Sequence, residues 1–385
     1  MIIKILLLVS SVNLGDASQA ERMIEAIATK VSVEKIEIDA NKSLQEAKSE
    51  YLHKVKSLAK DDKYITLAVG EKALELFKYL SETGTIDSSR SYNCLSIHQY
   101  FDDLAKLSIL DHIIVPEATI DKVSEKRIIK SFPNKTLIFS PLGDNPTNDE
   151  LKSSYENWDD PKKPALDGKY IIIMMPGDAP DSSNKMRYFT KESAYKLYQN
   201  VYKLWNSLGK QHKIIIQNGP RTGKFNPQTG ELLGKHEYIK GQDPDTAIDY
   251  ISTYFIGLFK DLEYQFYNLS FEIDGEHKKV ISFFNPLLYL AQQNENIFIL
   301  PGGSVSMIGQ IPLYLPSNRI ILFKASSTNE DHANIFRLAF KRNYLSYFSD
   351  SGEVITPKVI GHRNEDDSAI IARDIISGYT KKFSF

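Results

Sequence analysis

The stretch Ile2-Ile-Lys-Ile-Leu-Leu-Leu-Val9 decides the fold class of this chain. It is a nearly continuous apolar run of strand length, which is typical of a parallel strand buried on both faces. A polar loop containing Gly15 follows, and the apolar residues Met23, Ile24 and Ile27 then lie at helical spacing. A buried strand followed by an amphipathic helix indicates an α/β protein with a mostly parallel sheet.

The same alternation continues through the first half of the chain. A further helix is expected at residues 72–80, after a strand that ends at Gly70. Strands of the first half are expected at residues 2–9, 33–38, 64–69, 93–97, 112–115 and 136–140.

A polar, proline-containing segment at residues 157–168 interrupts this pattern and is interpreted as an interdomain linker. The alternation then restarts, which predicts a first domain at 1–157, a linker at 158–168 and a second domain at 169–360. The strands of the second half are expected at residues 170–175, 213–217, 262–266, 296–300 and 319–323, and its helices at 191–208, 243–259, 304–315 and 369–376.

Composition narrows the class of protein. The length of 385 residues fits two domains, and a formal net charge of −2 argues against a duplex nucleic acid or anionic membrane partner. Cys94 is the only cysteine, so no intramolecular disulfide forms and a cytoplasmic setting is expected. The apolar run at the N-terminus is short for a signal peptide, and no apolar stretch approaches the ~20 residues of a membrane span.

The strand-to-helix junctions are where a ligand is expected, because open α/β sheets bind ligands beyond the carboxyl ends of their strands. At Leu300-Pro-Gly-Gly-Ser-Val-Ser-Met307, paired glycines let the backbone approach a ligand, and Ser304 or Ser306 can cap a helix or bond phosphate oxygens. The alternative interpretation is an ordinary tight turn. Three other junctions of the second half carry unusual residues, at 175–184, at 217–224 and at Asn285-Pro286.

The junction Gln217-Asn-Gly-Pro-Arg-Thr-Gly-Lys224 is not a Walker A loop. That motif needs four residues between its glycines and a Ser or Thr after its lysine, whereas Gly219 and Gly223 enclose three and Phe225 follows Lys224. Arg221 remains a candidate, since a guanidinium on a glycine-flanked loop can neutralise a diphosphate without a metal. A surface arginine paired with a carboxylate is an equally good interpretation.

The first half offers three candidates for a general base at strand ends, namely Asp16, His98 and Glu117. Each also has a structural interpretation: Asp16 as a helix N-cap, His98 as a loop or core histidine, and Glu117 as a helix start. No metal is expected, because the eight histidines are scattered and no HExxH motif or cysteine cluster occurs. No G-x-S-x-G elbow of a serine hydrolase is present either.

Several junctions together resemble the mitochondrial-fission ELM-like family, a group of bacterial and plant proteins related to glycosyltransferase B enzymes. Gly303-Ser-Val-Ser-Met307 is similar to the family's Asp-Ser-Val-Ser-Met turn, with Gly303 in place of the aspartate. Arg221 and Thr222 match its Ser-Arg-Arg-Thr loop, and Asn285-Pro286 matches its Asn-Pro pair.

The resemblance implies two Rossmann-like domains facing across a cleft, with a terminal helix in residues 361–385 that crosses back to the first domain. It implies a nucleotide-sugar site mostly in the second domain, an acceptor site in the first, and no cofactor besides that co-substrate. Three hypotheses follow: a metal-independent glycosyltransferase, a sugar-nucleotide epimerase, or a non-catalytic scaffold. The expected ligand-binding residues are Gly15, Gln19, Gly177, Ser182, Asn184, Asn218, Gly219, Arg221, Thr222, Asn285, Pro286, Gly302, Gly303, Ser304, Val305, Ser306 and Gln310.

Overall fold

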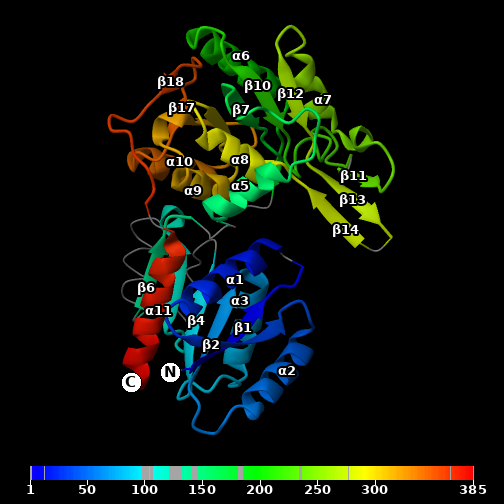
Figure 1. The fold of residues 1–385 in the computed structure, drawn as a ribbon. Coiled ribbons are helices and arrows are strands. Elements are labelled where there is room, and N and C mark those ends of the chain that lie inside the picture. Colours follow the sequence, from blue (N-terminus) through cyan, green and yellow to red (C-terminus); the bar gives the residue numbers. More distant parts are fainter. Residues whose placement is uncertain are drawn as a thin grey trace. The chain divides into compact units, whose positions relative to one another are not determined.

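The computed structural model separates the chain into two compact units (Figure 1). The first unit comprises Met1–Asp144 together with Glu365–Phe385, and the second comprises Asn145–Asn364. The structure describes residues 2–12, 14–97, 104, 107–120, 132, 134–140, 145–180, 185–233, 236–275, 277–364 and 366–384.

The first unit is built on a six-stranded parallel sheet in the order β2-β1-β3-β4-β5-β6. Strand β1 pairs with β2 on one side and with β3 on the other. The next strand is therefore added on the opposite side of β1 after β2, so the direction of winding switches between β1 and β3. Its strands are β1 (Ile2–Val9), β2 (Ser32–Asp39), β3 (Tyr64–Val69), β4 (Ser91–Ser96), β5 (His112–Pro116) and β6 (Asn134–Ile138), and its helices are α1 (Leu14–Ala28), α2 (Leu44–Ser57), α3 (Glu71–Glu82) and α11 (Asp367–Phe383), with the 3-10 turn η2 (Glu117–Thr119).

Strand β1 is buried on both faces, as its sequence predicts. Leu6 and Leu8 belong to one apolar cluster with residues of α2 and α3, and Ile5 and Leu7 belong to another with residues of α1 and α11. Cys94 lies fully buried in the second of these clusters. The two faces of the sheet are therefore covered by different helices.

Helix α11 returns to the first unit, which confirms the predicted crossing of the terminal helix. It packs against α1 and β6. The Asp367 carboxylate accepts a hydrogen bond of 2.7 Å from the backbone N–H of Phe139, and the Tyr379 hydroxyl donates one of 3.0 Å to the Lys63 carbonyl. The Lys382 ammonium forms an ion pair of 2.7 Å with Asp111.

The second unit has a seven-stranded sheet in the order β12-β10-β7-β15-β16-β17-β18, in which only β18 is antiparallel. Numbered from its own first strand, the parallel part runs 3-2-1-4-5-6, the order of dinucleotide-binding Rossmann domains, and the winding switches between β7 and β15. The strands are β7 (Tyr170–Met174), β10 (Lys213–Gln217), β12 (Tyr264–Tyr267), β15 (Ile297–Pro301), β16 (Ile320–Phe323), β17 (Ser346–Phe348) and β18 (Val354–Ile355).

Smaller elements complete the second unit. A three-stranded sheet in the order β11-β13-β14 contains the charged segment 272–279, which forms most of a hairpin. The remaining elements are α5 (Asn148–Glu156), α6 (Lys191–Ser207), α7 (Tyr250–Gly257), α8 (Phe284–Gln292), α9 (Val305–Gln310), α10 (Glu330–Lys341), β8 (Ala179–Pro180), β9 (Met186–Arg187), β11 (Glu237–Ile239), β13 (Ser270–Asp274), β14 (His277–Ile281), η3 (Pro244–Ala247), η4 (Ile311–Leu313) and η5 (Ser317–Arg319).

The segment expected to be a linker is packed onto the second unit. Helix α5 contacts α8, and the Trp158 ring lies 4.8 Å from that of Tyr267 and 5.3 Å from that of Phe283, measured between centroids. The Tyr267 hydroxyl also donates a 2.6 Å hydrogen bond to the Lys162 carbonyl. The division between units therefore falls near residue 145 instead of 158, because aromatic packing fixes this segment to the second unit.

Each unit is thus a doubly wound α/β domain. The fold class predicted from the sequence, two Rossmann-like α/β domains with a terminal helix returning to the first, is confirmed.

Candidate functional site

The carboxyl ends of β7, β10 and β15 adjoin one another in the second sheet and include its switch point. The loops after β7 and β10 are in contact. The backbone N–H of Asp178 donates a 2.9 Å hydrogen bond to the Arg221 carbonyl, and a Cβ atom added to Gly177 would lie 2.8 Å from the Cβ of Arg221. The structure thus brings the predicted residues Gly177 and Arg221 together, and only a residue without a side chain fits at 177.

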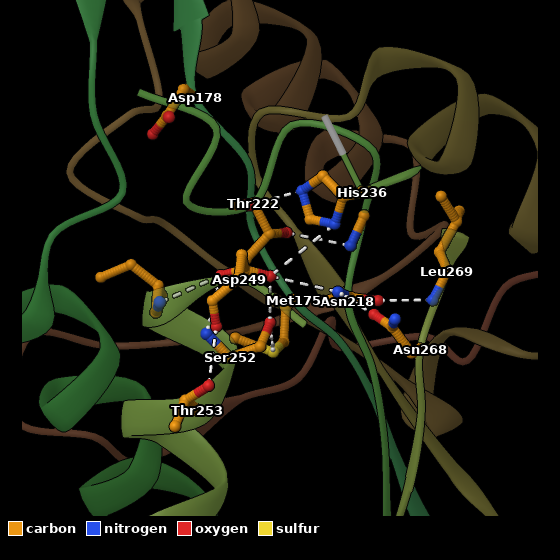
Figure 2. Close-up of polar contacts among 12 residues, drawn as sticks. Met175, Asp178, Asn218, Thr222, His236, Asp249, Ser252, Thr253, Asn268 and Leu269 are labelled. Carbon is orange, nitrogen blue, oxygen red and sulfur yellow. Dashed lines mark hydrogen bonds and ion pairs between the residues drawn. The ribbon is translucent and has the colours of Figure 1, made fainter. Parts of the chain in front are cut away.

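The side chain of Asn218 fixes the loop after β10 by hydrogen bonds to three neighbouring residues (Figure 2). Its amide nitrogen donates to Asp249 Oδ2 at 3.1 Å and to Asn268 Oδ1 at 2.8 Å, and its oxygen accepts from the Leu269 N–H at 2.6 Å. Asn218 is fully buried and all its polar atoms are engaged. It therefore positions the loop and does not present its side chain to a ligand, contrary to our expectation.

Asp249 is the centre of this buried network (Figure 2). It is the N-cap of α7, where Oδ1 accepts from the N–H groups of Ile251 and Ser252 at 3.0 and 2.8 Å, and Oδ2 accepts from the Ser252 hydroxyl at 2.6 Å. Gly223 has φ +59°, and a Cβ atom there would lie 2.4 Å from Asp249 Oδ1. Both the backbone angle and the closeness of the carboxylate require glycine at this position.

Thr222 and His236 are buried residues whose hydrogen bonds also fix the loop after β10. The Thr222 hydroxyl donates to the Pro176 carbonyl and accepts from the Gly219 N–H, both at 2.9 Å. His236 Nε2 lies 2.9 Å from the Thr222 carbonyl, so this nitrogen carries the proton, and Nδ1 lies 3.9 Å from Asp249 Oδ2. Thr222 is fully buried, so it also acts as a positioning residue and differs from the expected ligand contact.

Arg221 is an exposed residue of this loop, as is Pro220 directly before it. Asn218 and Thr222, which precede and follow this exposed part, are buried. Within the described part of the chain, no carboxylate forms an ion pair with its guanidinium. The alternative interpretation of Arg221, a surface arginine paired with a neighbouring acid, is therefore not what the described residues show.

Asp178 is a buried acid that we did not single out from the sequence. Its Oδ1 accepts from the Phe189 N–H at 2.8 Å and its Oδ2 from the Phe225 N–H at 3.2 Å. Burial raises the pKa of this carboxyl, and the hydrogen bonds from backbone N–H groups act in the opposite direction. The sequence signal that could have identified Asp178 is its position directly after Gly177, in a loop at the end of a strand.

The glycine turn after β15 has a different structure from the one we expected. The Gly302 N–H donates 2.8 Å to the Phe323 carbonyl, and an added Cβ atom would lie 3.0 Å from that oxygen, so this glycine packs on β16. A Cβ atom on Gly303 would meet only His332 Nδ1, at an ordinary 3.7 Å.

Helix α9, which follows this turn, is a poorer anion site than the sequence suggests. Ser304 occupies the N-cap position but makes no capping hydrogen bond, and the helix has six residues. A helix of this length offers little dipole to an anion. Val305 is half-buried, Ser306 is exposed and Gln310 is buried, so only part of this predicted set is accessible.

Asn285 and Pro286 lie in the first turn of α8, with Asn285 half-buried and Pro286 buried. The fully buried Gln217 at the end of β10 points towards this turn, and its Nε2 lies 3.5 Å from the Ser282 hydroxyl. Among the described residues, Gln217 Oε1 has no hydrogen-bond donor. Ser182 and Asn184 lie outside the described residues.

The switch point of the first unit contains Asp16 and Gln19, both on α1. Asp16 is buried, and a Cβ atom added to Gly70, whose φ is +86°, would lie 2.0 Å from Asp16 Oδ2. Gln19 is buried and donates 2.8 Å to the Ser96 hydroxyl at the end of β4. Gly15 is exposed in the first turn of the same helix.

The other two candidate bases are separate from Asp16. Glu117 begins η2 after β5 and is partly exposed, and strands β3 and β4 lie between β5 and β1 in the sheet. His98 lies outside the described residues. Asp16 and Glu117 therefore stand at different strand ends and do not form a pair.

Among the residues that the structure describes, no group of three or more His, Cys, Asp and Glu side chains is placed to hold a metal ion. No helix among those residues has the length and apolar character needed to cross a membrane.

No protein-family model and no curated protein sequence matches the chain. Solved structures with similar folds include the S. aureus MnaA-UDP co-structure, at 11% identity and TM-score 0.43 over 99% of this chain and 97% of that one. A UDP-GlcNAc 2-epimerase from Neisseria meningitidis bound to UDP-GlcNAc matches at 10% identity and TM-score 0.44, covering 98% and 100%. A glycosyltransferase from Rickettsia africae matches at 10% identity and TM-score 0.42, covering 99% and 98%.

Proposed function

We propose that the second unit binds a nucleotide sugar at the carboxyl ends of β7, β10 and β15, and that the protein is a metal-independent glycosyltransferase. The exposed Arg221 on a fixed loop is the observation that carries this proposal. The similarity of Arg221-Thr222, Asn285-Pro286 and Gly303–Met307 to motifs of the ELM-like family agrees with it.

Arg221 is suited to the diphosphate. A guanidinium offers paired N–H donors that match two phosphate oxygens, and its charge does not depend on pH in the physiological range. Because Asn218 and Thr222 hold the loop through buried hydrogen bonds, little conformational entropy remains to be lost in this backbone on binding. In a transferase the same charge would stabilise the departing nucleoside diphosphate.

The acceptor would be activated by a base of the first unit. Asp16 has the position expected of a residue at that unit's switch point, whereas Glu117 is the more exposed acid. His98 is the third alternative. Each would remove a proton from an acceptor hydroxyl.

Calorimetry with UDP, GDP, ADP and CMP, each with and without EDTA, tests binding. We expect one nucleotide to bind with an affinity that EDTA leaves unchanged. Arg221→Ala is expected to weaken it about 10- to 100-fold, the effect of losing a charged hydrogen bond. Arg337→Ala is the matched control, since Arg337 is exposed on α10 and pairs with Glu330 at 2.7 Å. Failure of all four nucleotides to bind would falsify the proposal.

Turnover then separates the three hypotheses. Transfer of the sugar from the bound nucleotide sugar to an added acceptor identifies a transferase. Conversion of the nucleotide sugar alone, followed by NMR, identifies an epimerase. Binding without either reaction identifies a scaffold.

A further inference from the structure

A cavity lies in the second unit, between α6 and the ends of β16 and β17. Its volume is about 670 Å³, which is within the range of small-molecule sites. None of its lining residues belongs to the nucleotide site proposed above. They are Thr190, Glu192, Ser193, Tyr195, Lys196, Gln199, Asn200, Lys203 and the segments 323–326 and 348–351.

Two polar residues in the lining of this cavity are buried, Ser193 and Asn200. Asn200 is the more deeply buried of the two. It is 4% exposed, and its amide nitrogen has no hydrogen-bond acceptor among the described residues. The turn after β17 packs directly on it, since a Cβ atom added to Gly352 would lie 2.4 Å from Asn200 Oδ1. Buried amide groups in proteins are almost always paired, so an unpaired donor beside a cavity indicates a missing acceptor.

Two lysines flank Asn200 on the same face of α6. Lys196 precedes it by four residues and Lys203 follows it by three, which places all three side chains together. The Lys203 ammonium donates 2.7 Å to the Ser351 carbonyl, and that of Lys196 lies 3.8 Å from Asp350 in a highly exposed pair. Such an exposed pair is weak, so an anion in the cavity can replace Asp350 as the partner of Lys196.

The walls of the cavity are fixed. The Ser193 hydroxyl accepts from the Ser326 N–H at 3.1 Å, and the Ser326 hydroxyl accepts from the Thr190 N–H at 3.2 Å. These bonds join the start of α6 to the loop after β16. Phe323 and Phe348, which are 2% and 6% exposed, also line the cavity.

We propose that this cavity binds a small organic anion, a phosphate monoester or a carboxylate, with its oxygens on Asn200, Lys196 and Lys203 and its carbon skeleton against Phe323 and Phe348. This ligand is independent of the nucleotide sugar.

Calorimetry with phenyl phosphate tests the site, because this probe joins an apolar ring to a phosphate. We expect binding that is at least about tenfold tighter than that of inorganic phosphate or phenol alone. Benzoate distinguishes a carboxylate from a phosphate ligand. A saturating amount of the nucleotide that binds the other site is expected not to displace the probe. Absence of binding by both phenyl phosphate and benzoate at 10 mM, or full displacement by the nucleotide, would overturn the proposal.

Two pairs of variants locate the binding. Asn200→Asp is expected to weaken phenyl phosphate binding about tenfold or more, because an anion replaces the donor. Asn206→Asp is the control, since Asn206 is exposed on the same helix and outside the cavity. Lys196→Gln is expected to weaken binding several-fold, while Lys210→Gln leaves it unchanged. If Asn200→Asp does not fold, the lysine pair decides, and equal affinity in Lys196→Gln and Lys210→Gln contradicts the proposal.

Discussion

The two units contain the same local arrangement and use it differently. In the first unit, Gly70 with φ +86° makes room for the buried carboxylate of Asp16, and in the second, Gly223 with φ +59° makes room for that of Asp249. Asp16 lies on the helix that follows the first strand. Asp249 caps α7 and supports, through Asn218, the loop that carries Arg221. The difference teaches that the same pairing of a glycine and a buried carboxylate can involve an acid within the first helix of a unit or an acid that caps a later helix and fixes a neighbouring loop.

The largest effect is expected when the Asp249 carboxylate, which supports the Arg221 loop through Asn218, is removed. Asp249→Ala deletes the acceptor for two backbone N–H groups, the Ser252 hydroxyl and Asn218. Because several buried donors lose their partner, we expect a loss of about 4 kcal/mol in the free energy of unfolding of the second unit. Urea denaturation measures this loss.

Asp243→Ala is the matched control, since Asp243 caps the exposed turn η3 and accepts from the Asp245 N–H at 2.9 Å. Its cost should be about 1 kcal/mol or less. Equal losses in the two variants would contradict the central position of Asp249.

Acid should act with opposite sign on one buried group in each unit, His112 in the first and Asp178 in the second. In the first unit, burial lowers the pKa of His112 to about 4, and its ring nitrogens lie 3.1 Å from the Tyr92 hydroxyl and 2.9 Å from that of Thr136. Unfolded histidine binds a proton near pH 6.5, so the first unit loses stability as the pH falls from about 6.5 to about 4, by about 3 kcal/mol in total.

In the second unit, burial raises the pKa of Asp178. The folded state then binds more protons than the unfolded state in the window above pH ~3.9, so this group contributes stability that rises as the pH falls. Denaturation curves between pH 4 and 7, compared with those of His112→Gln and Asp178→Asn, separate the two contributions. If the free energy of unfolding of His112→Gln depends on pH as that of the wild type does, His112 does not contribute to the loss of stability in acid.

The two glycines provide the next test. Gly70→Ala and Gly223→Ala each add a methyl group within 2.4 Å or less of a carboxylate oxygen, on a backbone with positive φ. We expect each to destabilise its own unit by about 2 kcal/mol. Gly241→Ala, with φ +91° and no atom within 4 Å, isolates the backbone contribution and should cost about 1 kcal/mol. Similar losses in all three would show that the carboxylates do not matter.

The smallest expected effect concerns Arg221 alone. Arg221→Lys keeps the charge but loses the paired donors, so nucleotide binding should weaken about tenfold while the unfolding midpoint stays unchanged. Calorimetry and thermal denaturation of the same samples measure both, with Arg337→Lys as the control. Wild-type affinity in Arg221→Lys would show that charge alone matters at this position.

The sequence predicts best the strands that are buried on both faces. Residues 64–69 and 213–217 were expected with the bounds that the structure has. Helix α2 was missed because it buries only Ala47 and Tyr51, which leaves little apolar periodicity. The sequence does contain a signal for the start of this helix, since Ser43 and Glu46 form a capping box.

For the candidate site, the sequence identifies the strand-end loops but not which of their side chains face inward. Position at a strand end identifies Asn218 and Arg221 equally well. Which of them faces inward depends on Asp249 and Asn268, which are 31 and 50 residues further along the chain. No local pattern at residues 217–224 contains that information.

The return of α11 has a consequence for how the protein is made. A ribosome delivers residues 367–383 only after the whole second unit has been synthesised, yet Ile371, Ile375 and Tyr379 complete one core of the first unit. Until then, nascent chains carry an incompletely covered apolar sheet face, and the Phe139 N–H lacks its carboxylate. The half that is translated first is therefore the last to be finished, and a chain truncated before residue 367 would expose that face to chaperones and aggregation.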